Sequence, residues 1–152
     1  MGKLESVLCV AAILCVLLSS LCSEARAAGD QMCRQQLTET IAKVRTGKTS
    51  ATRRDAAEHL FELTRAADCE ANDKTITELA SLMELPDDSV RYWVARSLGN
   101  FGQRAKIAAP KLQKVLAEVD CLEGSKTSAS GIRFALSQMG ITPPPAKCGT
   151  QN

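Results

Sequence analysis

The sequence has few aromatic residues, few glycines and prolines, and only one histidine. Aromatic side chains make up 3% of its 152 residues, and it contains nine glycines and five prolines. This composition excludes a collagen-like chain and, with 45% hydrophobic residues, a strongly disordered one. The formal net charge of +2 gives no reason to expect a nucleic-acid partner, which would require many more lysines and arginines on one face.

Alanine, leucine and long charged side chains are abundant. These residues form helices readily, whereas the aromatic and β-branched residues that favour strands are few. A chain of this length fits a single domain. We therefore expect an all-α protein.

Residues 1–27 have the pattern of a secretory signal peptide. A short charged start is followed by an apolar run of about 15 residues at 7–21, and the triplet at 25–27 offers a cleavage site of small residues. The run is shorter than the roughly 20 residues that cross a bilayer, so a retained anchor is the weaker alternative. Lipidation at Cys22 is weaker still, because a bulky leucine precedes it.

Cleavage after Ala27 predicts a periplasmic or secreted protein without a stable membrane anchor. It would leave a helical domain at residues 28–140 and an extended, proline-rich tail at 141–152. The leader takes three of the seven cysteines with it, and an even number of cysteines in an exported chain predicts two disulfides. The four cysteines that remain are Cys33, Cys69, Cys121 and Cys148.

Apolar residues recur at helical spacing from one end of this domain to the other. Cys33, Leu37, Ile41 and Val44 form the first stripe, and Gly47 follows it as a stop. Further helices are predicted to start at Thr49 or Ser50, at Asn72 and at Asp87, with a fifth helix through Ala105–Leu116 and a sixth near 126–139.

The stretch at 86–118 contains two amphipathic segments joined by a turn with two glycines, and it resembles a HEAT repeat, an antiparallel helix pair that stacks with copies of itself. Tyr92 and Trp93 depart from the pattern, because such repeats often carry small residues there. The residues that carry the resemblance are Asp87, Val90-Arg91, Ala95, Leu98-Gly99, Ala105, Ala108, Pro110, Leu112 and Leu116.

Weaker copies of this repeat lie on both sides. Residues 129–140 align without a gap with residues 88–99, an offset of about 41 residues that is within the usual HEAT period. Upstream, residues 55–60 and a partner helix through Leu82 form another copy. The resemblance implies a HEAT-like α-solenoid, a short right-handed stack of about six helices in antiparallel pairs, because each repeat buries its apolar face against the next.

The ends of such a stack suggest how the cysteines pair. Cys33 begins the leading helix and Cys69 follows the second, and those two ends meet in an antiparallel pair. The tail after Gly140 is about 25 Å long when extended, enough to run back along a sixth helix of about 21 Å and reach Cys121. We therefore predict the bridges Cys33–Cys69 and Cys121–Cys148.

The residues that could carry chemistry are isolated from one another. His59 has no nearby set of ligands or catalytic partners, and the cysteines lack the CxxC spacing of zinc and redox sites. Asp87 and Asp88 are better explained as a helix start than as a catalytic acid pair. We predict no enzyme, no metal and no cofactor, while a lyase-like activity that uses His59 or a cysteine stays open.

A contact patch is the alternative to a reaction centre. Tyr92 and Arg96 are four residues apart and share a helix face that we expect to point partly outward, and Trp93 lies beside them. Tyrosine, tryptophan and arginine are favoured anchors of protein interfaces. Lys111 and Lys114 lie in a polar row with Glu118 on the other helix of the repeat, and such a row is normally only a solvated face. The predicted partner-binding residues are Tyr92, Trp93, Arg96, Lys111 and Lys114, with Trp93 as a gap filler and a solvated Arg96 as the competing interpretation.

The function predicted from the sequence is an exported protein–protein interaction module. Its concrete form is a periplasmic immunity-type inhibitor that covers the active cleft of an exported or injected enzyme, such as a toxin or a cell-wall hydrolase. A structural subunit or assembly factor of an envelope complex is the alternative, and a homodimer is compatible with both.

Overall fold

The computed structural model describes residues 31–66, 69, 71–119, 121 and 124–145. The predicted signal peptide at 1–27, the end of the tail and Cys148 lie outside the described residues. The chain divides into two units, residues 1–32 and residues 33–152, and the fold described here is that of the second. Among the described residues, no helix is long and apolar enough to cross a membrane.

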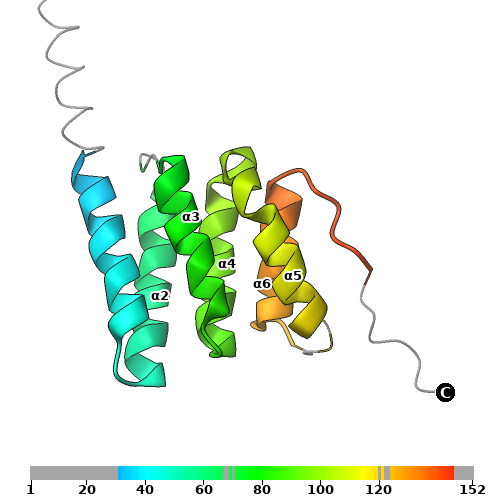
Figure 1. Cartoon of the computed structure of the whole chain (residues 1–152), viewed down its shortest axis with the longest axis horizontal. Helices are drawn as coiled ribbons and strands as arrows, with labels where there is room; N and C mark the ends of the chain where they lie inside the picture. The colour runs from blue at the N-terminus through cyan, green and yellow to red at the C-terminus, as the bar shows by residue number, and fades with distance from the viewer. Residues whose placement is uncertain (1–30, 67–68, 70, 120, 122–123, 146–152) are drawn as a thin grey trace, which may run out of the picture. The chain divides into compact units, whose positions relative to one another are not determined.

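The described part of the second unit is helical throughout and contains no strand, which confirms the all-α prediction over these residues. Over the described ranges there are six α-helices and two short 3-10 helices (Figure 1), in agreement with the expected number of about six. They are a helix at 31–46, α2 (Ser50–Arg65), α3 (Asp73–Ser81) with η1 (Leu82–Glu84), α4 (Asp88–Asn100), η2 (Gly102–Ala108), α5 (Ala109–Val119) and α6 (Ser128–Gln138).

Helices α2, α3 and α4 begin where the sequence predicts. The side chains of Thr49, Asn72 and Asp87 each accept a hydrogen bond from the backbone N–H three residues on, and Thr127 does the same for α6. The fifth helix starts later than predicted, because residues 102–108 form η2 instead. Pro110 therefore lies in the first turn of α5, where its missing N–H costs no hydrogen bond.

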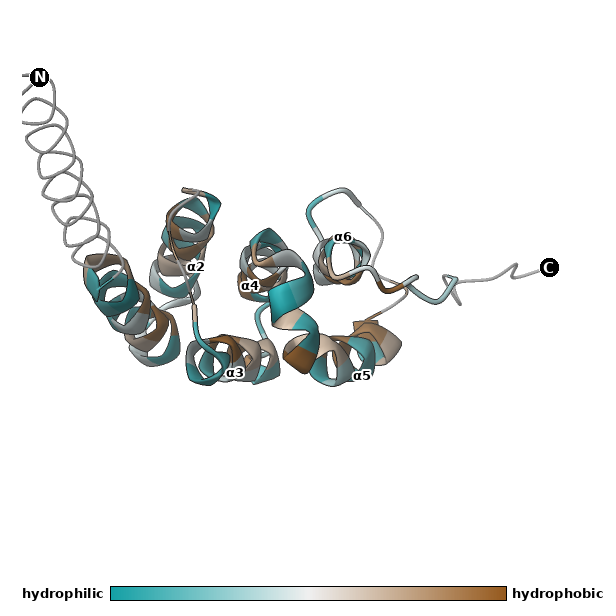
Figure 2. Ribbon diagram, turned by 90° about the horizontal axis from the view of Figure 1, so that it is seen from above, coloured by the Kyte–Doolittle hydropathy of each residue, from teal (hydrophilic) through white to brown (hydrophobic). Residues whose placement is uncertain are grey.

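The helices of the second unit lie in two rows. Figure 2 shows α2, α4 and α6 side by side in one row, with α3 and α5 in the other. Helix α4 packs against α2 on one side and α6 on the other, and it also contacts α3. Each helix turns one apolar face to the layer between the rows, where Leu60, Leu79, Leu98, Leu112 and Ile132 are fully buried. No single pair could bury these faces alone.

Two glycines bring α4 and α6 unusually close. A Cβ atom on Gly131 would lie 2.8 Å from the carbonyl oxygen of Tyr92 and 3.2 Å from its Cα. At the other end of the contact, a Cβ on Gly99 would lie 2.8 Å from the ring of Phe134 and 3.2 Å from the Cα of Ala135. The helix backbones therefore approach to a distance that no larger residue allows at these positions.

Side chains at the helix starts join α2, α4 and α6 along one edge. The Asp87 carboxylate caps α4 and also accepts a hydrogen bond from the Ser50 hydroxyl at the start of α2. Asp88 accepts hydrogen bonds from the backbone N–H of Ser128, at 3.0 Å, and from its hydroxyl at the start of α6. Both carboxylates lie at the positive ends of helix dipoles, which favour negative charge. Asp87 caps α4, as the helix-start interpretation predicts, and both carboxylates also connect α4 to a neighbouring helix.

The disulfide Cys33–Cys69 is present, which confirms that prediction. The two Cα atoms are 5.6 Å apart, and the bridge closes a loop across a sequence separation of 36. Cys121 is exposed and pairs with no described cysteine, and Cys148 lies outside the described residues, so the second bridge stays a prediction.

The tail turns back after α6. Gly140 adopts a left-handed backbone with a φ of +74°, and the N–H of Ile141 donates to the carbonyl of Leu136 at 2.9 Å. The Arg133 guanidinium then donates a hydrogen bond to the carbonyl of Pro144. The tail therefore contacts α6 as far as Pro144, in the direction that the predicted bridge to Cys121 requires.

Replacing Gly131 with alanine should destabilise the fold. In an exposed helix the same change would add up to about 1 kcal/mol of stability. Here the new methyl group meets the backbone of Tyr92, which cannot move without shifting α4. We expect a net loss of about 1–3 kcal/mol in the free energy of unfolding, measured by denaturant titration.

The matched control is Ser137→Ala on the exposed side of α6, which should change the unfolding free energy by less than about 0.5 kcal/mol. A Gly131→Ala protein as stable as the parent, or more stable, would contradict the close contact between α4 and α6.

Removal of the Cys33–Cys69 bridge should also lower the stability. For a loop of 36 residues, the loop-entropy model gives a loss of about 4 kcal/mol, because the reduced unfolded chain gains conformational freedom. Chemical unfolding of the double variant Cys33→Ser/Cys69→Ser checks this value, again with Ser137→Ala as the control. An unfolding free energy equal to that of the control would contradict a stabilising bridge.

Candidate functional site

A row of aromatic rings and guanidinium groups crosses α2, α4 and α6. We call it the aromatic–arginine row; its members are Phe61 and Arg65 of α2, Trp93 and Arg96 of α4, and Phe134 of α6. The Phe61 and Trp93 ring centroids are 5.3 Å apart, and the Arg65 guanidinium carbon lies 5.9 Å from the Phe61 centroid. Phe61 is nearly buried, Arg65 is exposed, and the other three members are partly exposed.

Arg96 is the centre of the row. Its guanidinium carbon lies 3.8 Å from the Phe134 ring centroid and 5.5 Å from the Phe61 centroid, so rings from the helices on either side of α4 hold it. Its Nε atom is buried and has no hydrogen-bond acceptor. No carboxylate of the described chain lies within ion-pair distance of this side chain, as the ion pairs between described residues involve other partners.

Trp93 joins the row to the core. Its ring meets Tyr92 edge-on at 4.9 Å and 66°, and it packs partly buried against the hydrophobic core. Its ring therefore contributes to the packing of α4 against α2. It also keeps part of its surface exposed next to Arg96.

The prediction that Tyr92 points partly outward is wrong. Only 9% of Tyr92 is exposed. The cause is the close approach of α6, because the missing side chain at Gly131 lets that helix cover Tyr92. The sequence marks Gly131 only as an isolated glycine within a predicted helix, which does not show which helix packs there.

Lys111 and Lys114 lie away from the row, so the structure does not bring the five predicted residues into one patch. They line a small pocket of about 160 Å³ together with Met83, Glu84, Arg91, Val115 and Glu118. The Lys111 ammonium group hydrogen-bonds to Glu84. That hydrogen bond, the charge of Lys111 and the charge of Lys114 together lower the pKa of the Glu84 carboxyl.

Three members of the row are not among the residues that the sequence predicts for binding. They are Phe61, Arg65 and Phe134. Phe134 could have been found, because it aligns with Trp93 when residues 129–140 are laid on 88–99. Equivalent positions of adjacent repeats lie side by side in a stack.

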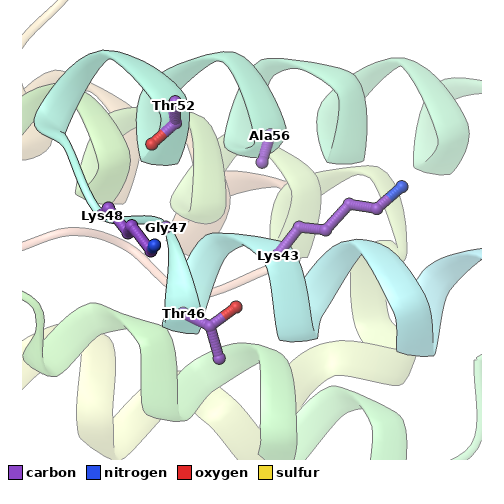
Figure 3. A pocket seen from close by; sticks show the side chains of 6 residues that line it. All are labelled: Lys43, Thr46, Gly47, Lys48, Thr52 and Ala56. Carbon is purple, nitrogen blue, oxygen red and sulfur yellow. The ribbon is translucent and has the colours of Figure 1, made fainter.

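Two further hollows border the helices. One, of about 420 Å³, surrounds the turn before α2 and is lined by Lys43, Thr46, Gly47, Lys48, Thr52 and Ala56. Figure 3 shows that the ammonium groups of its two lysines point apart, so they do not converge on one ligand. The other, of about 440 Å³, lies where α2 and α4 end and includes Arg65, Asn100 and Arg104. The aromatic–arginine row thus continues into this second hollow through Arg65.

The remaining candidates for chemistry do not form a site in the described residues. His59 is exposed on α2. Across the ranges that the structure describes, no three histidine, cysteine, aspartate or glutamate side chains gather to hold a metal ion. The Asp87 and Asp88 carboxylates hydrogen-bond to the helix starts.

Replacing Lys111 with alanine should raise the pKa of Glu84 toward its ordinary value. The pKa is lowered in the folded protein, so the ion pair stabilises the fold above the ordinary carboxyl pKa and loses this effect as the pH falls through the lowered pKa. An NMR titration of the Glu84 carboxyl in the parent and variant measures the change. Lys106→Ala, an exposed change elsewhere, is the control. Equal Glu84 pKa values in the parent and in Lys111→Ala would contradict the interaction.

Comparison with known protein families finds a match in the segment from α4 to α5. Residues 90–118 match the family model described as PBS lyase HEAT-like repeat. The match covers most of α4, all of η2 and nearly all of α5, and it lies within the stretch that resembles a HEAT repeat by its residues. No curated protein and no solved structure was found to match the chain. This protein contains a HEAT-like repeat at residues 90–118.

Proposed function

We propose that this protein is an exported, non-catalytic docking module that binds another protein through its aromatic–arginine row. HEAT-like repeats commonly mediate interactions between proteins and are generally non-catalytic. In this proposal the helices form a short right-handed stack, and the row lies across three consecutive helices of one layer. Such a layer offers a rigid surface, so little conformational freedom is lost on binding.

The observation that carries the proposal is the exposure of Trp93 and Arg96 next to one another on a fixed frame. Tryptophan and arginine dominate the energetics of many interfaces, because both combine a large contact area with hydrogen-bonding groups. Here the neighbouring rings of Phe61 and Phe134 already hold Arg96 in place. A partner would therefore meet side chains that are already ordered.

The partner in this proposal is an exported or injected enzyme. The signal-peptide pattern supports export to the periplasm or the medium, and the Cys33–Cys69 bridge suits an oxidising compartment. An immunity-type inhibitor needs only to cover an active cleft, which a small rigid protein does by steric occlusion. Lys111 and Lys114, which lie in their own pocket, would steer such a partner through their charge.

A structural subunit or assembly factor of an envelope complex is the second candidate. It uses the same surface but leaves the activity of the partner unchanged. A lyase-like reaction that uses His59 or a cysteine has the least support, because His59 has no hydrogen-bond partner within the described part of the chain.

Affinity capture from the exported fraction of the source cells tests the docking function. The bait is the full chain expressed with its own leader, and the double variant Trp93→Ala/Arg96→Ala is compared with Thr77→Ala, an exposed change on α3. We expect a partner that the parent and Thr77→Ala retain and that the double variant binds at least about thirtyfold more weakly, the equivalent of one hot-spot residue.

The activity of the captured partner separates the candidates. An inhibitor abolishes a hydrolytic activity of the partner at equimolar ratio, whereas a structural subunit leaves it unchanged and co-elutes with a larger complex. Retention of every partner by the double variant at unchanged affinity would contradict the proposed surface. Mass measurement of the exported chain that finds residues 1–27 retained would contradict the cleaved leader.

A further inference from the structure

Arg96 combines a buried, unpartnered Nε with contacts to two aromatic rings. Arg53 and Arg91 also bury an Nε without an acceptor, but of the three only Arg96 lies against aromatic rings in the described part of the chain. Its two terminal nitrogens are not among the buried atoms that lack partners, and no hydrogen bond within the described chain uses them. The guanidinium group is thus a fixed cation with one open edge.

We propose that this open edge of Arg96 receives the carboxylate of an aspartate or glutamate side chain of the partner protein. This inference rests on the proposed docking function and names the chemistry that the partner brings to the site.

The two rings restrict how a ligand can approach. The guanidinium carbon of Arg96 lies 3.8 Å from the Phe134 ring centroid and 5.5 Å from that of Phe61, so ring carbons crowd the group. Guanidinium N–H groups donate in the plane of the group, and because Nε is buried, the two terminal nitrogens are the donors left for a ligand. A carboxylate meets such a pair with two parallel hydrogen bonds, which a single-point acceptor cannot form.

The surroundings favour a single carboxylate over a polyanion. The neighbouring cation of the row, Arg65, is already paired with Glu62 at 3.1 Å. The partly exposed ring of Trp93 offers an apolar contact next to Arg96. An acidic residue flanked by apolar residues fits this combination.

Arginine side-chain NMR on the full exported chain tests the proposal directly. The probe is a blocked pentapeptide, acetyl-Gly-Leu-Glu-Leu-Gly-amide, whose only charge is the glutamate carboxylate; the comparison peptide has glutamine in its place. We expect the Nε–H resonance of Arg96 to shift saturably with the glutamate peptide. The glutamine peptide should bind at least about tenfold more weakly, as expected for the loss of one charge-assisted pair.

Two variants separate recognition from folding. Arg96→Lys keeps the charge but removes the planar pair of donors, so peptide affinity should fall about tenfold. Phe134→Leu keeps Arg96 and removes the nearer ring, and affinity should fall about two- to fivefold. Arg54→Lys, an exposed arginine on α2, is the matched control and should bind as the parent does.

Several results would overturn the proposal. They are equal shifts with both peptides, unchanged affinity in Arg96→Lys, tighter binding of inorganic phosphate than of the glutamate peptide at equal ionic strength, or no saturable shift at about 10 mM peptide in the folded protein.

The capture experiment keeps the two failures apart. A partner that is retained by Arg96→Lys but lost by Trp93→Ala/Arg96→Ala would leave the docking function standing and overturn the carboxylate receptor. Binding of the glutamate peptide at Arg96 in a protein that captures no partner would support the carboxylate receptor and contradict the docking function.

Discussion

The close contact between α4 and α6 at Gly99 and Gly131 is the constraint on which the rest of the structure depends. It brings the backbone of Tyr92 against α6 and the Phe134 ring against α4. Because α2 packs on the opposite side of α4, the central helix is covered on both sides. The same contact builds the candidate site, since the ring that fills the space beside Gly99 is the ring that lies over Arg96. The helix packing and the proposed binding surface therefore share the Phe134 ring.

Polar contacts fix the register of this layer where the helices begin. Asp87 and Asp88 follow one another in the chain, yet one connects α4 to α2 and the other connects α4 to α6. The sequence places these two carboxylates at a helix start but does not show which other helices they contact. In the folded chain they join three helix starts at one edge of the layer. The members of the aromatic–arginine row lie further along the same three helices.

Local signals in the sequence were sufficient for the helices, their caps, the first disulfide and the repeat at 90–118, because apolar spacing and capping residues act within a few positions of the chain. They were not sufficient for the site. Tyr92 was placed partly outward because helical spacing describes one helix and does not show that Gly131 of another admits it to the interior. Lys111 and Lys114 share a repeat with Arg96 but lie in a pocket with Glu84, since the two helices of a pair turn different faces to the surface. The apolar pattern within one repeat does not identify Phe134, which is found only when residues 129–140 are aligned with residues 88–99.

The central claim is that the exposed side of the α2, α4 and α6 layer at the aromatic–arginine row is the surface that meets a partner. Site-specific photo-crosslinking in the source cells tests it most directly, with a photoreactive residue introduced at Ser137 of α6, one turn beyond Phe134, or at Thr77 of α3, both exposed positions. The account predicts a discrete crosslinked protein from position 137 and none from position 77. Crosslinking from position 77 alone, or from neither position, would contradict it.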